Sequence, residues 1–186
     1  MDEGNEVCTE QKMSESLKRR FFMFKNNNAY LAMSTEELST LSDNELFYAV
    51  MVRTEQKAES FQNWKDGVNA LNPSQKIFYS LNWLEVEVNN GGLCQFFVNS
   101  SRMVAPFISE YMAIVGAFEH KELFDNFILS SGIDFSDLSF FDIHDLSEFE
   151  KKYEAYPFDD YDDEFYDMEP LETYLTKFVK EHLEDF

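Results

Sequence analysis

The most restrictive feature of this sequence is a helical repeat with a clear start and a clear stop. Asn72 followed by Pro73 is typical of a helix N-cap with proline in the first turn. Apolar side chains then recur at three- and four-residue intervals, at Ile77, Leu81, Leu84 and Val88. The run Asn-Asn-Gly-Gly at residues 89–92 ends the repeat, because Asn and Gly accept the left-handed conformation that closes a helix. The sequence therefore predicts one amphipathic helix from residue 73 to about residue 90.

Further helices are predicted on both sides of this one. The pattern Ser-x-x-Glu, a capping box, occurs at Ser34 and again at Ser42, and the second box begins a predicted helix over about 43–61. The other predicted helices cover residues 93–99, 103–118, 121–129 and about 171–183. Glu110 is the only charged residue in 103–118, so we expect that segment to be a central core helix. A short hairpin around 133–145 is the one exception considered, and the predicted fold is all-α.

The chain divides into an N-terminal arm and one compact multi-helix domain. The Asn26-Asn27-Asn28 run interrupts the helical pattern, so residues 1–33 are predicted to be an arm with one short helix and residues 34–186 the domain. A chain of 186 residues is long enough to bury a core of its own. The basic cluster Lys18-Arg19-Arg20 lies beside the apolar run 21–24, which indicates a local role in docking a helix.

The net charge of −21 limits the partners that this chain can bind. It repels nucleic acid and anionic membranes and favours a basic macromolecule. The apolar run 21–24 is too short for a signal-peptide core or a membrane span. Cys8 and Cys94 are too few for a disulfide framework in a chain of this length. We therefore expect a cytoplasmic protein that binds neither nucleic acid nor membrane directly.

The negative charge is concentrated in the last third of the chain. Residues 133–186 hold 18 Asp and Glu against 4 Lys and Arg, a net of −14, whereas residues 1–132 have a net of −7. Many aromatic residues are interspersed among these carboxylates, which indicates an acidic face on folded structure rather than a detached tail. The predicted partner-binding surface consists of Asp142, Asp145, Glu148, Glu150, Asp159, Asp160, Asp162, Asp163, Glu164, Asp167, Glu169 and Glu172.

The segment from Glu87 to Ser100, read as EVNNGGLCQFFVNS, resembles the signature of the DNA mimic protein 19 family. The similarity extends over roughly residues 40–186, and Leu93 replaces a phenylalanine that is usual in the family. The resemblance implies an all-helical domain, a homodimer in the studied case, and surface carboxylates that imitate DNA phosphates and capture the DNA-binding surface of a transcription factor. Most relatives have no assigned role.

Taken residue by residue, the signature indicates a structural joint between two helices. The residues with this expected role are Glu87, Asn89, Asn90, Gly91, Gly92, Gln95, Phe96, Phe97 and Asn99. The glycines permit positive φ, the asparagines can cap backbone groups, and the two phenylalanines can fix the second helix to the core. The alternative is that Glu87, Asn89, Asn90, Gln95 and Asn99 converge on a small polar ligand or a peptide.

No pattern in the sequence indicates catalysis, a metal or a cofactor. His120, His144 and His182 are far apart, lack zinc-ligand spacing and are predicted to be surface residues. Cys94 lies among apolar residues, where an inert buried thiol is the usual outcome. The run 159–164 is expected to be a solvated turn, and the absence of glycine after Gly132 argues against an EF-hand.

The leading hypothesis is a non-enzymatic DNA mimic that occupies the nucleic-acid-binding surface of a basic protein, such as a transcription factor or a nuclease, and inhibits it. One alternative is an immunity-type protein that neutralises a basic toxin. The other is a small-ligand binder, or an unrecognised enzyme, that uses the Asn-Gly joint.

Overall fold

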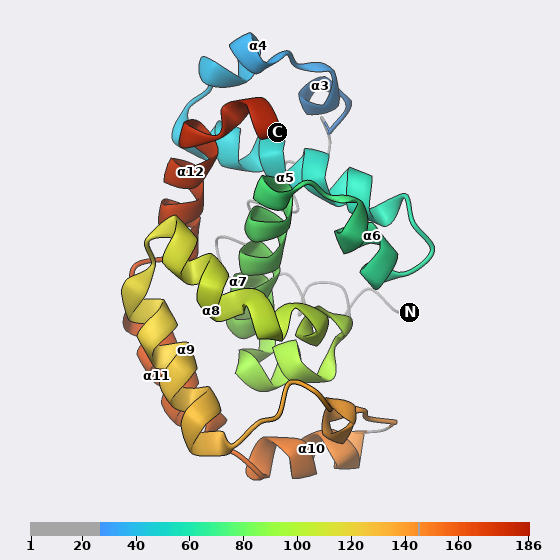
Figure 1. The fold of residues 1–186 in the computed structure, drawn as a ribbon, viewed down its shortest axis with the longest axis vertical. Coiled ribbons are helices and arrows are strands. Elements are labelled where there is room, and N and C mark those ends of the chain that lie inside the picture. Colours follow the sequence, from blue (N-terminus) through green and yellow to red (C-terminus); the bar gives the residue numbers. More distant parts are fainter. Residues whose placement is uncertain (1–26, 145) are drawn as a thin grey trace, which may run out of the picture.

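The computed structural model describes residues 27–144 and 146–186, and these residues form helices joined by short loops (Figure 1). The α-helices are α3 (Asn27–Ala32), α4 (Thr35–Ser39), α5 (Asp43–Glu59), α6 (Trp64–Ala70), α7 (Pro73–Val98), α8 (Ala105–Val115), α9 (Phe118–Ser131), α10 (Leu146–Glu154), α11 (Phe158–Asp167) and α12 (Leu171–Glu181). Within these two ranges the 3₁₀ helices are η2 (Ser100–Val104), η3 (Ser139–Phe141) and η4 (Leu183–Asp185). These described residues contain no β-strand, so the all-α prediction is confirmed, and η3 lies where a hairpin was considered.

Helix α7 is the central element. It contacts α5, α6, α8, α11 and α12, and it runs through the middle of the molecule in Figure 1. The predicted apolar positions Leu81, Leu84 and Val88 are fully buried. The N-cap and proline predicted at its start are present, and Asn72 and Gln75 form a capping box. The predicted start and inward face of this helix are thus confirmed.

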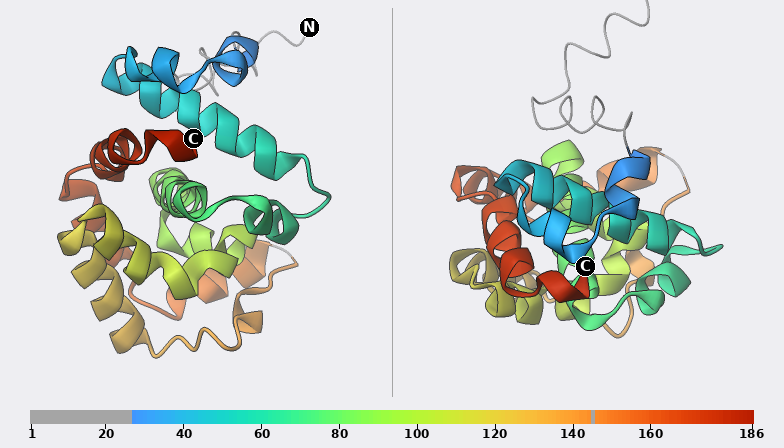
Figure 2. Two further views of the ribbon diagram at one scale, coloured as in Figure 1. Left: turned by 45° about the horizontal axis from the view of Figure 1, so that its top comes forward. Right: turned by 90° about the horizontal axis from the view of Figure 1, so that it is seen from above.

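The C-terminal turn η4 closes the start of α7. The side-chain amides of Asn72 and Gln75 donate hydrogen bonds to the backbone carbonyl of Asp185 at 2.7 and 2.9 Å. The hydroxyl of Ser74 donates to the Asp185 carboxylate at 2.6 Å. Figure 2 shows the C-terminus lying between α5 and the beginning of α7. The end of the chain is therefore part of the domain.

Helix α8 differs from the central core helix expected over residues 103–118. It begins after the 3₁₀ turn η2 and ends at Gly116, whose φ of 83° closes the helix. One face is buried, through Ile108 and Met112, but Phe107 and Ile114 on the other face are each 48% exposed. The expectation of a central core helix therefore holds for one face only, because the low charge of this segment gave no indication that the other side is left open.

The acidic last third of the chain is folded around an aromatic cluster. Phe97 of α7 stacks on Phe141 of η3 at 4.7 Å between ring centroids. Phe127 of α9 lies 5.2 Å from Phe158 of α11, which also neighbours Phe97. Burial of these rings stabilises the packing of α11 against α7 and α9. The expectation that this acidic region has its own buried side chains is confirmed.

Most of the predicted arm, residues 1–26, lies outside the described residues. Residues 27–33, also assigned to the arm, pack on the domain: Tyr30, Leu31 and Met33 contact the core, and Arg53 donates to the Met33 carbonyl at 2.8 Å. In the described part of the chain, no helix has the length and apolar character needed to cross a membrane.

Candidate partner-binding surface

The signature glycines break α7 into two helical parts. Gly91 and Gly92 have non-helical backbone angles, and Gly92 has a φ of 76°. The carboxylate of Asp162 on α11 accepts a hydrogen bond from the backbone N–H of Leu93, the first residue after the break, at 2.8 Å. A Cβ atom on Gly92 would lie 2.1 Å from that same carboxylate. Position 92 therefore requires glycine both for its backbone angles and for the approach of Asp162.

Helix α11 satisfies the other side of the break as well. The hydroxyl of Tyr166 donates a hydrogen bond to the backbone carbonyl of Val88 at 2.7 Å. Because an interrupted helix leaves backbone donors and acceptors without their usual partners, these two side chains replace the missing bonds. The break in α7 and the position of α11 are consequently fixed together.

Glu87 explains two further signature residues, Gln95 and Asn99, and also binds Ser101 just beyond the signature. Its buried carboxylate accepts hydrogen bonds from the amides of Gln95 at 2.6 Å and Asn99 at 2.9 Å, and from the hydroxyl of Ser101 at 3.1 Å. Charge-assisted hydrogen bonds of this kind compensate a buried carboxylate. Phe96 and Phe97 are fully buried, as expected.

The two signature asparagines do not have the expected capping role. Asn89 and Asn90 are exposed, and their side chains make no hydrogen bond with another residue of the described segments. The side chains of Asp162 and Tyr166 satisfy the backbone instead. With Gln95 bonded to Glu87 and both asparagines exposed, the geometry gives no support to a ligand site built from these residues.

Asp162 is buried, so it does not belong to the surface to which the sequence assigned it. The run 159–164 forms the first part of α11 rather than a turn, and its inward face is Phe158, Tyr161, Asp162 and Phe165. Burial raises the pKa of Asp162 from 3.8 to about 6; the hydrogen bond from Leu93 opposes this rise, and the carboxylates of Asp159 and Asp163 add to it. Its carboxylate has a structural role.

The outer face of α11 carries the densest group of exposed carboxylates predicted from the sequence. We call it the α11 acidic face; its residues are Asp159, Asp160, Asp163, Glu164 and Asp167. They form two rows at four-residue spacing, in which neighbours are separated by about 6 Å along the helix axis. The helix contains no Lys or Arg. A partner approaching this face therefore meets carboxylates from every turn of the helix.

The remaining predicted acidic residues lie around this face in different settings. Asp142 forms an ion pair with Arg102, which offsets its charge. Glu148 is half-buried and accepts a hydrogen bond from the backbone of His144 at 2.7 Å. Glu150 and Glu169 are exposed, Glu172 is half-buried in the first turn of α12, and Asp145 lies outside the described residues.

A groove that the sequence did not reveal runs along the α11 acidic face. It has a volume of about 260 Å³ and lies between α9 and α11, which pack side by side (Figure 1). Asp160 and Glu164 line it from α11, and Asn126 and Ser130 line it from α9. Tyr161 also lines it, and its buried hydroxyl has no hydrogen-bond partner among the described residues. The groove thus combines two carboxylates with neutral polar groups.

The histidines and Cys94 do not form a catalytic group. His120 is buried between Phe165 and Tyr174, contrary to the surface position predicted, and burial lowers its pKa. His144 and His182 are exposed. Burial raises the pKa of Cys94 to about 12, with a smaller contribution from Asp162, so its thiol stays protonated. Within residues 27–144 and 146–186, no three His, Cys, Asp or Glu side chains are arranged to hold a metal ion.

Comparison with known proteins agrees with the resemblance seen in the signature. Searches of curated proteins and of solved structures found no match. The family model of DMP19-like proteins matches residues 69–182, which include the signature, the break in α7 and the whole of α11. Because this match covers more than half of the 186 residues, the chain belongs to the DMP19-like protein family.

Proposed function

We propose that this protein is a non-enzymatic acidic decoy that occupies the nucleic-acid-binding surface of a basic protein and inhibits it. The observation that carries the proposal is the α11 acidic face: five exposed carboxylates on a ten-residue helix without a cation. A basic protein that releases counterions from DNA phosphates gains in the same way when it docks on such a face. Membership of the DMP19-like family supports the same function.

The fixed position of α11 favours a shaped surface over a diffuse negative charge. Its inner face is held by Phe158, Tyr161 and Phe165, and its Asp162 and Tyr166 bond to the backbone of α7. A rigid helix presents its carboxylates without the entropy cost of ordering a loop at binding. The partner therefore meets a preorganised row of charges.

The groove between α9 and α11 fits an arginine or lysine side chain of that partner. The carboxylates of Asp160 and Glu164 match cationic donors, and the amide of Asn126 and the hydroxyl of Ser130 offer neutral hydrogen bonds. Arginine and lysine are side chains with which DNA-binding proteins contact phosphates and guanine bases. A groove of this composition can therefore take the side chain that would otherwise contact DNA.

The test is capture of basic nucleic-acid-binding proteins from a lysate at low salt, followed by competition with duplex DNA. We expect DNA to displace the captured protein and the variant Asp160→Asn/Asp163→Asn/Glu164→Gln/Asp167→Asn to lose capture. A matched control is Glu36→Gln/Glu110→Gln/Glu181→Gln/Glu184→Gln, which removes the same charge from exposed positions elsewhere and should retain capture. Equal loss of capture in both variants would show that the interaction depends on net charge alone and not on the α11 acidic face. A single captured toxin that DNA cannot displace would favour the immunity alternative.

A further inference from the structure

A cavity lined by other helices than the groove between α9 and α11 has features of a docking site. It lies between α3, α5 and α7 and has a volume of about 360 Å³. Leu31, Val52 and Trp83 supply its apolar lining, and Glu55 and Glu59 are the charged residues among the described ones that line it. The cavity is therefore apolar and negatively charged at once.

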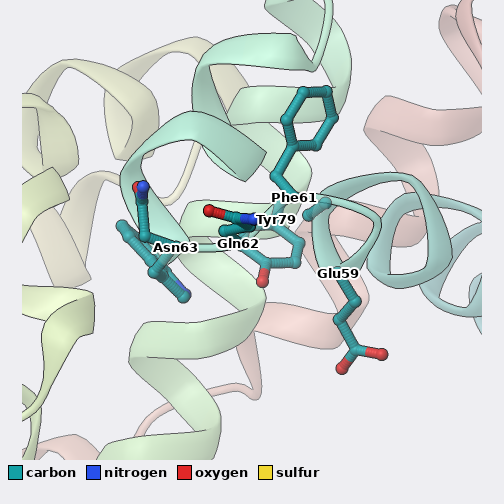
Figure 3. A pocket seen from close by; sticks show the side chains of 7 residues that line it. Glu59, Phe61, Gln62, Asn63 and Tyr79 are labelled. Carbon is teal, nitrogen blue, oxygen red and sulfur yellow. The ribbon is translucent and has the colours of Figure 1, made fainter.

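Glu59 connects this cavity to a second one. The second cavity, of about 220 Å³, is shown in Figure 3 with Glu59, Phe61 and Tyr79 among its lining side chains. Three aromatic rings join the two cavities: Trp64 lies 5.9 Å from Tyr79, and Tyr79 lies 6.1 Å from Trp83, measured between ring centroids. Aromatic faces next to carboxylates favour cationic and aromatic side chains.

One segment of this chain has the complementary composition. Residues 18–25 read KRRFFMFK, with four of the chain's 15 cations, three phenylalanines and no carboxylate. The segment is also attached at the right place. Residue 24 is three positions before Asn27, where α3 begins, so it lies within about 11 Å of that residue. Asn28 and Leu31 of α3 line the cavity themselves.

We propose that residues 18–25 dock in this cavity of their own chain, with the phenylalanines against Leu31, Val52 and Trp83 and the cations beside Glu55 and Glu59. Attachment through α3 makes the docking intramolecular, so it gains from a high effective concentration. The docked segment neutralises carboxylates on the α5 side of the domain and leaves the α11 acidic face open. The inference does not depend on the proposed function, because the cavity and the groove between α9 and α11 are lined by different residues.

The experiment measures acrylamide quenching of Trp83 fluorescence in the full chain carrying Trp64→Phe, which leaves Trp83 as the single tryptophan. Acrylamide is neutral, so charge substitutions do not alter its local concentration. We expect Arg19→Glu/Arg20→Glu to raise the quenching constant about two-fold or more. The new glutamates would repel Glu55 and Glu59, so that the segment leaves the cavity and exposes the Trp83 ring. Adding Glu55→Lys/Glu59→Lys should restore the original value.

The control Lys151→Glu/Lys177→Glu makes the same charge change at exposed positions elsewhere and should leave quenching unchanged. Far-UV circular dichroism checks that every variant is folded. Equal quenching in all variants, or no recovery in the four-fold variant, would overturn the proposal. Quenching that depends on protein concentration would also overturn it, because the segment would then dock on a second copy.

Discussion

The carboxylate of Asp162 accepts a hydrogen bond from the backbone N–H of Leu93 at 2.8 Å and thereby joins two segments that are 69 positions apart. Leu93 begins the second part of α7, and Asp162 lies on the inward face of α11. The contact places the outer face of the same helix, with its exposed carboxylates, in a defined position. The family signature and the acidic surface are in this way parts of one arrangement.

Replacing Asp162 by alanine should destabilise the fold. The substitution leaves the Leu93 N–H without its acceptor in a buried position, which costs about 1–3 kcal/mol of the free energy of unfolding. Urea denaturation measures this loss. The neighbouring Asp163→Ala is the control, because an exposed side chain without such a contact should change stability by less than about 0.5 kcal/mol. Equal effects at both positions would contradict the structural role of Asp162.

The raised pKa of Asp162 predicts a specific dependence of stability on pH. The folded pKa of about 6 lies above the ordinary value of 3.8, so the folded state binds a proton more readily than the unfolded state between these values. The contribution of Asp162 is therefore fully present below about pH 4 and is lost as the pH rises through 6. Subtracting the pH profile of Asp162→Asn from that of the wild type isolates it. A flat difference between pH 4 and 7 would show that the buried carboxyl is not perturbed.

Gly92→Ala should cost much more stability than Gly132→Ala. Both glycines have positive φ, of 76° and 65°, so both substitutions carry a backbone cost of about 1 kcal/mol. Only at position 92 does the added Cβ also meet Asp162 Oδ2, whereas nothing lies within 4 Å at position 132. We expect a difference of about 2 kcal/mol or more in urea denaturation, the range of substitutions that force buried atoms apart. Equal losses would indicate that α11 is not fixed against the break.

The sequence predicts best those structural features that depend on residues close together in the chain. The capping boxes at Ser34 and Ser42, the N-cap at Asn72 and the glycine stop depend on residues within one turn, and the structure confirms them. The role of Asp162 could not be predicted in the same way, because in sequence it is one of five carboxylates among the six residues 159–164. Counted from Phe158, the residues Tyr161, Asp162 and Phe165 follow at three, four and seven positions. This spacing of one helix face was the available signal for an inward position of Asp162.

Other site residues have no local signal at all. The groove between α9 and α11 depends on two helices packing together, so Asn126 and Ser130 could not be assigned to it from the sequence. Glu85 is a further example: its buried carboxylate accepts hydrogen bonds from the backbone N–H groups of Leu171 and Glu172 at the start of α12. Only its position next to the apolar stripe of α7 hinted at burial.

The exposed apolar residues of α8 lead to a prediction about assembly. The resemblance to the DNA mimic family implies a homodimer, and Phe107 and Ile114 are large apolar side chains left open on this helix. We expect sedimentation equilibrium to report a dimer and Ile114→Glu to shift it toward monomer, because a buried unpaired charge opposes association. Phe61→Glu, at an exposed apolar residue of the α5–α6 loop, is the control. A wild-type protein that stays monomeric at every concentration would contradict the prediction.

The salt dependence of partner binding tests the central claim most directly. For the captured basic protein, the logarithm of the binding constant should fall linearly with the logarithm of salt concentration, as for its binding to DNA. The variant Asp160→Asn/Asp163→Asn/Glu164→Gln/Asp167→Asn should bind weakly with a clearly shallower slope. The control Glu36→Gln/Glu110→Gln/Glu181→Gln/Glu184→Gln should keep the wild-type slope. Identical slopes for the wild type and the α11 variant would contradict the account, because the α11 acidic face would then not be the surface that imitates DNA.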